Sequence, residues 1–371
     1  MKYILLLSGD FIDLGKEEVL SLFNIKGYED GGRLFIINLE NESELRESLV
    51  KRLALTKSMY ALLFECNASN LTDLMKKFDW NSVYRENFCL RISDFNDNNN
   101  DAITNKSVTK QNNKKISKNR ITNKFSEKYL AKYIWRSIKC PKVNLENPKT
   151  KIELFFYSGK VYCGLLVYEN KENFEKRKAH LRPFPHPSSL QPKVARALVN
   201  ISEIKKPEVL FDPFCGTGGF LIEAGLMNIR TIGYDINKIM AKGCKVNLKY
   251  FGIKNFKIKN KNAIDINDRF DHVVTDFPYG LNSNAMASYE KDWKKFRINK
   301  KIKTKNFTKN LEKFYLLFLK NLRKKLKKKA VIIFPSYVNH RLLLKKSKLN
   351  VEKEFSIYVH RSLTRKIVKI Y

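Results

Sequence analysis

Cysteine, histidine and acidic residues are scarce in this sequence, and it contains no long apolar run. Its six cysteines and five histidines are scattered over 371 residues, with no C-x-x-C pair. This spacing argues against a zinc site and against a disulfide framework. We therefore expect no bound metal and a reduced, cytoplasmic protein. The apolar run 4–7 is followed at once by Asp10 and Asp13, so it is too short for a signal or membrane-spanning segment and predicts a buried strand.

The shortage of acidic residues gives the chain a large positive charge. It has 72 Lys and Arg residues against 37 Asp and Glu residues, a formal net charge of +35. A dense array of cations binds polyphosphates by releasing their counterions, so nucleic acid is the expected partner. Because Lys far exceeds Arg and Asn is abundant, compositional bias accounts for part of this excess. Charge alone therefore names no substrate.

The front half of the chain predicts two small domains. Residues 1–80 alternate apolar clusters with polar turns in a β-α-β-α-β rhythm, which predicts an α+β, ferredoxin-like module. A new strand near residue 88 opens a second unit over residues 81–170. Within it, the segment from about 95 to 124 is too polar to bury a core and predicts a mobile insertion.

The back half predicts an α/β domain. A charged linker at 171–185 precedes residues 186–371, in which strands and helices alternate. Such alternation is typical of a parallel sheet covered by helices. Two strand-like segments at 355–359 and 367–371 predict a terminal antiparallel hairpin appended to that sheet.

The first motif is a glycine-containing loop between a strand and a helix. It reads Asp212-Pro213-Phe214-Cys215-Gly216-Thr217-Gly218-Gly219. A dinucleotide fingerprint would need glycine at Leu221, and a P-loop would need Gly-Lys-Ser/Thr, so both types of site fit poorly. Asp235 ends the next strand, where a carboxylate can accept hydrogen bonds from ribose hydroxyls.

A loop and a carboxylate in this order indicate an adenosine-containing ligand without a pyrophosphate, and S-adenosylmethionine (S-adenosyl-L-methionine) meets that description. Alone, the glycines would fit an ordinary tight turn and Asp235 a helix cap. Together they predict a cofactor site, with contacts from Asp212, Cys215, Gly216, Thr217, Gly218 and Asp235. His186, upstream of the loop, is open to two interpretations, a pocket residue or a hydrogen-bonded structural histidine.

The second motif, Asp276-Phe277-Pro278-Tyr279-Gly280, follows the fourth strand of the back half. The lone pair of a nucleobase amine is delocalised into the ring, so an enzyme must draw that density back onto nitrogen with hydrogen-bond acceptors. We assign Asp276 as the acceptor that orients the amine and receives its proton, and the carbonyl of Phe277 as a second acceptor. Pro278 shapes the turn, and Tyr279 offers a stacking surface for an extruded base. Alone, this pentapeptide would equally fit a surface turn.

With both motifs in place, the chain resembles the archaeal and eukaryotic family of tRNA guanine-N2 methyltransferases acting on guanine ten. Members join a THUMP RNA-binding domain to a Rossmann-like methyltransferase domain. The resemblance covers nearly the whole chain and is carried by segments 186–192, 212–225, 276–280 and 360–365. It implies that residues 81–170 are a THUMP-like domain that grips tRNA, and that residues 186–371 hold the cofactor and the target guanine.

Two positions depart from the family pattern. Phe277 stands where a second proline is usual, and Lys261-Asn262-Ala263 stands where Gly-Asp-Ala is usual. The resemblance places Asn262 and Ala263 in the cofactor site, where the amide oxygen of Asn262 can accept from the adenine amine, less strongly than a carboxylate would.

The resemblance implies a tRNA methyltransferase with no DNA substrate. Two alternatives stay open: the same chemistry on a ribosomal guanine or on adenine N6, and an RNA-binding protein whose methyltransferase domain has decayed. The sequence does not decide whether one or two methyl groups are added, or whether a small activating subunit is needed.

Overall fold

The computed structural model describes the chain except for residues 42–44, 97–124, 187–188 and 280–302. Most of the predicted insertion at 95–124, and Gly280 of the second motif, lie outside the described residues. The chain divides into two compact units. Unit 1 comprises residues 1–12, 23–50 and 56–171, and unit 2 comprises residues 13–22, 51–55 and 172–371.

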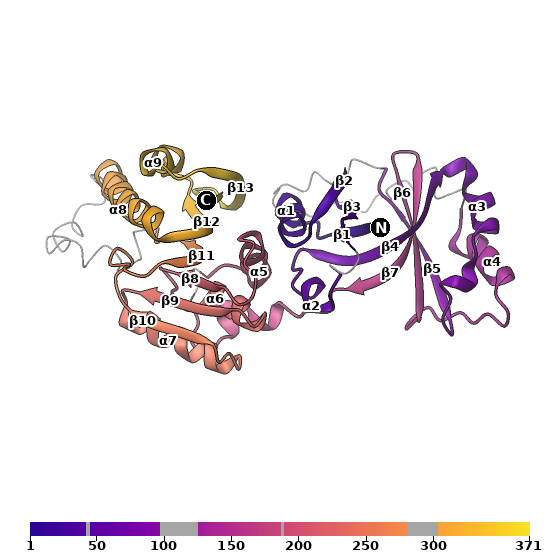
Figure 1. The fold of residues 1–371 in the computed structure, drawn as a ribbon, viewed down its shortest axis with the longest axis horizontal. Coiled ribbons are helices and arrows are strands. Elements are labelled where there is room, and N and C mark those ends of the chain that lie inside the picture. Colours follow the sequence, from indigo (N-terminus) through magenta and orange to yellow (C-terminus); the bar gives the residue numbers. More distant parts are fainter. Residues whose placement is uncertain (42–44, 97–124, 187–188, 280–302) are drawn as a thin grey trace, which may run out of the picture. The chain divides into compact units, whose positions relative to one another are not determined.

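Unit 1 is built on one seven-stranded sheet in the order β2-β3-β1-β4-β7-β6-β5 (Figure 1). The strands are β1 (Lys2–Leu7), β2 (Ile25–Gly31), β3 (Leu34–Leu39), β4 (Thr56–Asn67), β5 (Phe88–Asp94), β6 (Thr150–Tyr157) and β7 (Lys160–Glu169). Neighbours are antiparallel except β5 and β6. Because β4 pairs with both β1 and β7, strands from residues 1–80 and from residues 81–170 share this sheet. The boundary between those two expected domains stays a prediction.

The helices of unit 1 are α2 (Glu47–Val50), α3 (Leu71–Lys77) and α4 (Glu127–Ser137). Ser126 caps α4 by accepting a hydrogen bond from the Tyr129 amide. Leu130 and Ile134, one helical turn apart, lie in the same buried cluster as Trp80. This cluster joins α3 and α4 to β5 and β6, so the spacing of apolar residues along α4 determines which of its faces is buried.

Unit 2 contains a second seven-stranded sheet, in the order β10-β9-β8-β11-β12-β14-β13. The strands are β8 (Val209–Asp212), β9 (Arg230–Asp235), β10 (Phe256–Asn260), β11 (Phe270–Asp276), β12 (Leu326–Pro335), β13 (Val351–His360) and β14 (Leu363–Ile370). The first five in this order are parallel, and β14 and β13 form an antiparallel hairpin beside β12. The predicted Rossmann-like sheet with a terminal hairpin is confirmed.

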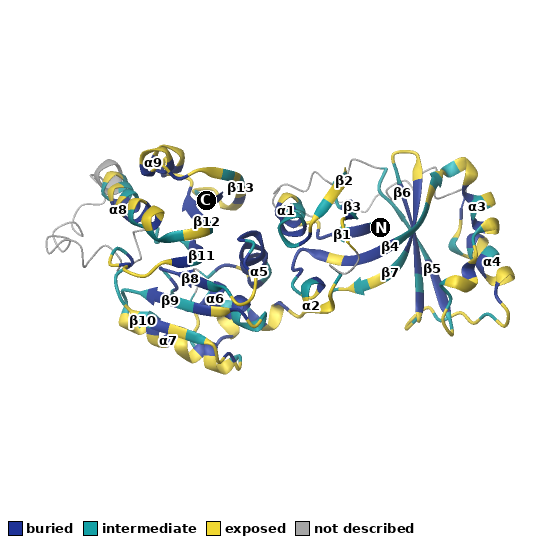
Figure 2. Cartoon of the chain, viewed as in Figure 1, coloured by how far each residue is buried: buried dark blue, intermediate teal, exposed yellow. Residues whose placement is uncertain are grey.

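Two apolar clusters hold helices against this sheet. The helices of unit 2 are α1 (Ile12–Leu22, from Asp13 on), α5 (Pro192–Ile201), α6 (Gly219–Leu226), α7 (Lys238–Tyr250), α8 (Lys303–Lys325) and α9 (His340–Ser347). Tyr234 of β9 lies in the cluster with α8 and α9, whereas a Cβ on Gly233 would meet Leu221 of α6. Because neighbouring strand residues face opposite ways, α6 and α8 cover opposite faces. Figure 2 shows the buried strands between them.

Short 3-10 helices cover Ala68–Asn70 and Trp80–Ser82 in unit 1, and Glu175–Arg177 and Ala179–Leu181 in unit 2.

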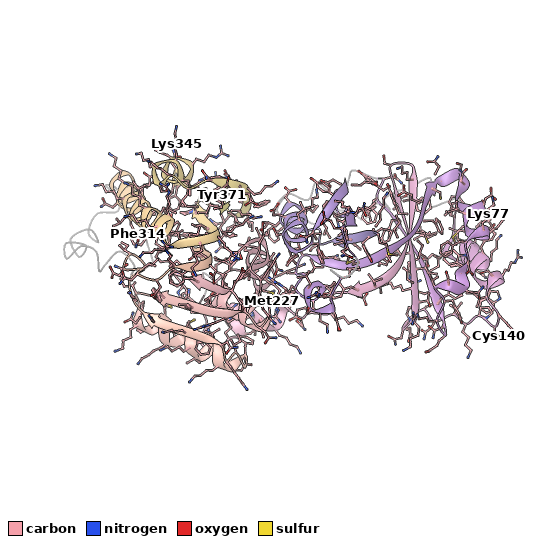
Figure 3. All side chains as sticks on the ribbon, viewed as in Figure 1. Lys77, Cys140, Met227, Phe314, Lys345 and Tyr371 are labelled. Atoms are coloured by element: carbon pink, nitrogen blue, oxygen red, sulfur yellow. The ribbon has the colours of Figure 1, made fainter. Side chains whose placement is uncertain are left out.

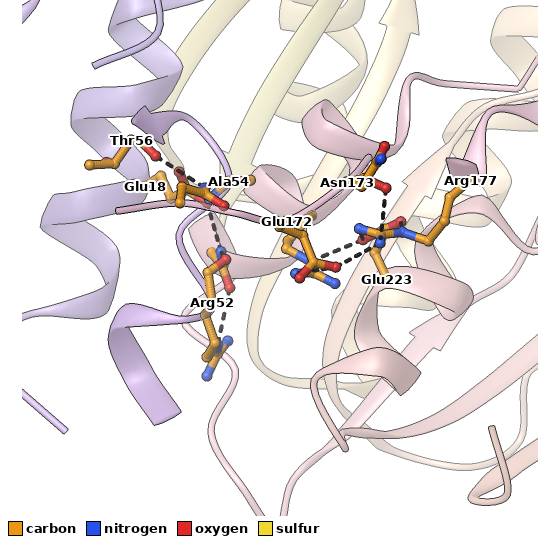
Figure 4. A network of polar contacts seen from close by, with 11 residues as sticks. Glu18, Arg52, Ala54, Thr56, Glu172, Asn173, Arg177 and Glu223 are labelled. Atoms are coloured by element: carbon orange, nitrogen blue, oxygen red, sulfur yellow. Dashed lines mark hydrogen bonds and ion pairs between the residues drawn. The ribbon is translucent and has the colours of Figure 1, made fainter. Parts of the chain in front are cut away.

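A buried ion network joins α6 to α5 and to the 3-10 helix Glu175–Arg177. Glu223 of α6 is fully buried and pairs with Arg177 at 2.8 Å and with Arg196 of α5 at 3.0 Å. Glu172 also contacts Arg177, at 2.6 Å (Figure 4). With two guanidiniums and two carboxylates together, each buried charge has a partner.

Helix α1 and residues 51–55 pack in unit 2 although they precede it in the sequence. Fully buried Glu18 accepts hydrogen bonds from the amides of Ala54 and Leu55, each at 2.8 Å, and from the side-chain amide of Asn200 at 2.7 Å. Asn200 belongs to α5 and also accepts from Arg52 Nε at 3.1 Å (Figure 4). Burial raises the pKa of Glu18. The carboxylate therefore ties α1 and residues 54–55 to helix α5.

We expect Glu18→Ala to lower the free energy of unfolding by about 3 kcal/mol, because it leaves three buried donors without an acceptor. Urea unfolding followed by tryptophan fluorescence and circular dichroism measures this. Asp13→Ala is the matched control, since the Asp13 side chain on the same helix is 87% exposed. An equal urea midpoint for both variants would contradict the proposed bracing role of Glu18.

Candidate functional site

Three strands of the unit 2 sheet carry an aspartate at or near their carboxyl ends. Asp212 ends β8, Asp235 ends β9 and Asp276 ends β11. These strands are neighbours in the order β9-β8-β11, so the three carboxyl groups lie along one edge. All three line a single cavity of about 690 Å³. In a mostly parallel sheet this edge is where ligands bind.

Asp212 fixes the start of the glycine loop. Its Oδ1 accepts hydrogen bonds from the Thr275 hydroxyl at 2.7 Å and from the Phe214 amide at 3.1 Å. Burial raises the pKa of Asp212 to about 7, although both hydrogen bonds oppose this. The side chain thus joins the loop to neighbouring β11 and borders the cavity.

Asp235 fixes the middle of the same loop. Its Oδ2 accepts from the Gly216 amide at 2.9 Å, and its Oδ1 accepts from the Asn237 amide at 2.8 Å. Burial raises its pKa, and these two hydrogen bonds oppose the rise. Each carboxylate oxygen can accept a second hydrogen bond. Asp235 therefore holds the loop and still offers acceptors to the cavity.

The loop needs glycine at two positions. Gly216 has φ +49° and Gly218, the N-cap of α6, has φ +91°, both in the left-handed region. A Cβ on Gly218 would lie 2.9 Å from Cys244 Sγ, whereas a Cβ on Gly216 would meet nothing within 4 Å. Gly216 lines the cavity together with Cys215, Thr217 and Gly219. Gly218 does not line it and faces α7.

Neighbouring segments complete this half of the cavity. His186, Ser189, Asn262 and Ala263 all line it, and Ser189 Oγ lies 3.2 Å from Thr217 Oγ1. Asn262 Oδ1 accepts from the Ile264 amide at 3.1 Å, which leaves one further lone pair on that oxygen.

Asp276 lies at the end of a hydrogen-bonded chain of side chains. The Tyr279 hydroxyl donates to Asp276 Oδ1 at 2.6 Å, and Arg365 Nε donates to Tyr279 Oη at 3.0 Å. Arg365 Nη2 also lies 3.6 Å from Asp276 Oδ2. Burial raises the pKa of Asp276 to about 6, while the charge of Arg365 and the hydrogen bond from Tyr279 oppose the rise. Asp276 thus stays mostly ionised at neutral pH.

Aromatic side chains support the turn after Asp276. The Phe277 ring is 2% exposed and stacks on Tyr315 of α8, with ring centroids 4.1 Å apart. The Tyr315 hydroxyl donates to the Pro278 carbonyl at 2.7 Å, and the Tyr337 hydroxyl donates to the Tyr279 carbonyl at 2.8 Å. Phe314, labelled on α8 in Figure 3, also lines the cavity. This packing fixes the backbone of the predicted catalytic turn.

The terminal hairpin forms another part of the cavity wall. His360, Ser362 and Leu363 line the cavity, and the hairpin is fastened to the end of β12 where the Ser336 amide donates to the Thr364 carbonyl at 2.9 Å. Segment 360–365 is one of the segments that carry the family resemblance, but the sequence predicted no role for Arg365. Arg365 is one of several basic residues around the start of this strand, and such a residue identifies no partner by itself.

Sequence reasoning also gave no role to Thr275, Tyr315 or Tyr337. Of the residues predicted for the site, all except Gly218 line one cavity.

Within the described ranges, no group of three or more His, Cys, Asp or Glu side chains could hold a metal ion. Over the same ranges, no helix is both long and apolar enough to cross a membrane.

Comparison with known proteins gives consistent similarities. A family model described as an RMKL-like methyltransferase domain matches residues 179–297. A tRNA (guanine(10)-N2)-dimethyltransferase from Methanothermobacter thermautotrophicus is 29% identical over 380 residues, covering 99% of this chain and 98% of that protein. The protein of the same name from Pyrococcus abyssi is 39% identical over 161 residues, which cover 42% of this chain and 48% of that protein. The crystal structure of TrmN from Thermus thermophilus shares the fold, with a TM-score of 0.50, 14% identity and coverage of 100% of this chain and 99% of that one.

The two loop glycines generate a prediction about stability. Gly218→Ala should lower the free energy of unfolding by about 2 kcal/mol, because it combines a left-handed residue with a close contact, and Gly216→Ala by about 1 kcal/mol, from the left-handed backbone alone. In a Cys244→Ala background the cost of Gly218→Ala should shrink, since Sγ is gone. A double-mutant cycle in urea measures this coupling, and an unchanged cost would contradict the contact.

Proposed function

We propose that this chain, which belongs to the family of tRNA (guanine(10)-N2)-dimethyltransferases, transfers one or two methyl groups from S-adenosylmethionine to the exocyclic N2 amine of guanine 10 in tRNA. The observation that carries the proposal is the single cavity, which is lined both by the glycine loop with Asp235 and by the turn that begins at Asp276. A cofactor and a nucleobase would there be neighbours. Methyl transfer requires this proximity.

The cavity residues fit the cofactor. Gly216 has open space where a side chain would lie, so its backbone can approach a ligand closely. Asp235 and Asn262 keep free lone pairs for the ribose hydroxyls and the adenine amine, respectively. When bound, S-adenosylmethionine supplies an electrophilic methyl group on its sulfonium sulfur. Cys215, Thr217 and Ala263 would complete its contacts.

The residues around Asp276 would prepare the target amine. An ionised carboxylate accepts a hydrogen bond from the amine, raises the electron density on nitrogen and afterwards takes up its proton. The Phe277 carbonyl would be the second acceptor, and Pro278 and Tyr315 keep that turn in place. The target amine would replace the Tyr279 hydroxyl at Asp276. Tyr279 would then contact the base.

We further propose that unit 1 is the tRNA-binding part, with a THUMP-like domain within residues 81–170. The charge of +35 supports a polyanionic partner. The proposal includes no DNA substrate, no membrane, and a cytoplasmic location in keeping with six free cysteines.

The proposal is tested by incubating the protein with methyl-labelled S-adenosylmethionine and an unmodified tRNA transcript, followed by nucleoside analysis and mapping of the label. We expect N2-methylguanosine or N2,N2-dimethylguanosine at position 10. Asp276→Asn should lower the rate at least about 1000-fold, because an amide cannot take the proton. Its affinities for cofactor and tRNA, measured by calorimetry, should stay within about threefold.

Other outcomes select the alternatives. Label in N6-methyladenosine, or in ribosomal RNA only, would replace the substrate. Tight tRNA binding without S-adenosylmethionine binding would identify an RNA-binding protein with a decayed site. Undiminished turnover by the Asp276→Asn variant would remove Asp276 from its assigned role.

The proposal also predicts a pH dependence. Burial raises the pKa of Asp276 to about 6, and only the ionised carboxylate accepts from the amine. The rate at saturating cofactor and tRNA should therefore fall as pH drops through about 6, roughly tenfold for each further pH unit. Asp212 and Asp235 also have raised pKa values, so cofactor binding can depend on pH as well. Calorimetry at each pH therefore checks that cofactor and tRNA are saturating. A rate that stays constant down to pH 5 would contradict this dependence.

A further inference from the structure

Arg365 is a cation beside Asp276 to which the predicted mechanism assigns no task. It lies on β14, opposite Pro335 of β12 and Ile357 of β13. Its side chain is 13% exposed, so its charge is largely removed from water. A guanidinium in such surroundings requires acceptors or a counter-charge. The described contacts supply both in Tyr279 and Asp276.

The directions of these hydrogen bonds follow from the chemistry of the groups. A guanidinium can only donate, so the Tyr279 oxygen accepts from Arg365. The single Tyr279 proton is then directed to Asp276 Oδ1, 2.6 Å away. The chain runs from Arg365 through Tyr279 to Asp276. It supplies a donor to one carboxylate oxygen and a positive charge near the other, and both favour the ionised form.

Three further described side chains that interact with Asp276 carry no positive charge. Asp212 and Asp276 repel each other, and this repulsion contributes to the raised pKa of Asp212. Tyr315 from α8 and Tyr337 from the segment after β12 also interact with Asp276, and both have a raised pKa, mainly because they are buried. They therefore remain neutral in the working range of pH. Among the described residues, Arg365 is the one whose positive charge opposes the raised pKa of Asp276.

We propose that Arg365 is a positioning residue for methyl transfer, which orients Tyr279 towards Asp276 until the target amine replaces that hydroxyl, and keeps the Asp276 carboxylate ionised as the amine binds. This inference rests on the proposed function for the reaction that it serves. The electrostatic part concerns Asp276 alone and can be measured without any substrate.

The test compares Arg365→Gln, Arg365→Lys and Lys366→Gln in the full-length protein. Lys366 is the matched control, because it neighbours Arg365 on the strand but contacts Ser356 rather than Tyr279 or Asp276. Its replacement by Gln removes the same charge as Arg365→Gln. The readouts are the carboxyl carbon-13 NMR titration of Asp276, assigned by its loss in Asp276→Asn, and the pH profile of the rate at saturating substrates. Melting temperature and cofactor affinity report whether each variant is folded.

For Arg365→Gln we expect Asp276 to titrate at a pH higher by about one, and the acid limb of the rate profile to move with it. At pH 7 the rate should then fall about twofold; the loss should approach about tenfold below pH 6 and disappear as the pH is raised. Arg365→Lys keeps the charge but loses the fork, so it should titrate near wild type and recover part of the rate. Lys366→Gln should match wild type in both readouts.

An unchanged Asp276 titration in Arg365→Gln would overturn the inference. So would a rate that falls by the same factor at every pH together with a lower melting temperature, since Arg365 would then only brace the hairpin. A wild-type protein that does not methylate tRNA would reject the proposed function. In that case the NMR titration still decides whether Arg365 controls the ionisation of Asp276.

Discussion

Three carboxyl groups buried along one edge of a sheet constrain everything around this cavity. Burial raises the pKa of Asp212, Asp235 and Asp276 alike, so each of them needs donors close by. Those donors come from different parts of unit 2: a hydroxyl on β11, amides of the glycine loop and of the start of α7, and side chains from the turn after β11 and from the terminal hairpin. Satisfying the carboxylates therefore assembles the cavity walls.

The three aspartates differ in the kind of partner that they hold. Asp235 bonds to two backbone amides, and Asp212 bonds to one amide and a buried hydroxyl. These partners are backbone amides or, for Thr275, a fully buried hydroxyl on β11, so they belong to the framework. The partners of Asp276 are the side chains of Tyr279 and Arg365, which can rotate. Hence two of the carboxylates are suited to hold a rigid cofactor loop, and the third is suited to exchange one partner for a substrate amine.

Much of the fold could be predicted because local patterns determine it. Buried strands such as β8, β9 and β11 are short apolar runs that each end in aspartate, and a strand was predicted directly before or at each of these aspartates. The rhythm predicted for residues 1–80 has three strands and lacks β2, because every residue of β2 is exposed or only partly buried, which leaves no apolar alternation. The packing of α1 in unit 2 was also missed. It depends on Glu18, a residue type usually found on surfaces, and on Asn200, which lies 182 positions further along the chain.

The departure from the family motif at Phe277 follows from the same packing. The residue contributes a backbone carbonyl and a ring, and only the carbonyl is common to phenylalanine and proline. The ring is buried against Tyr315 and Phe334, so an apolar cluster on α8 and β12 accommodates it. Sequence alone could state that the carbonyl survives. It could not show the stacking partner, which lies on α8 beyond residues 280–302, and for the same reason of distance it could not connect Arg365 to Tyr279, 86 residues earlier.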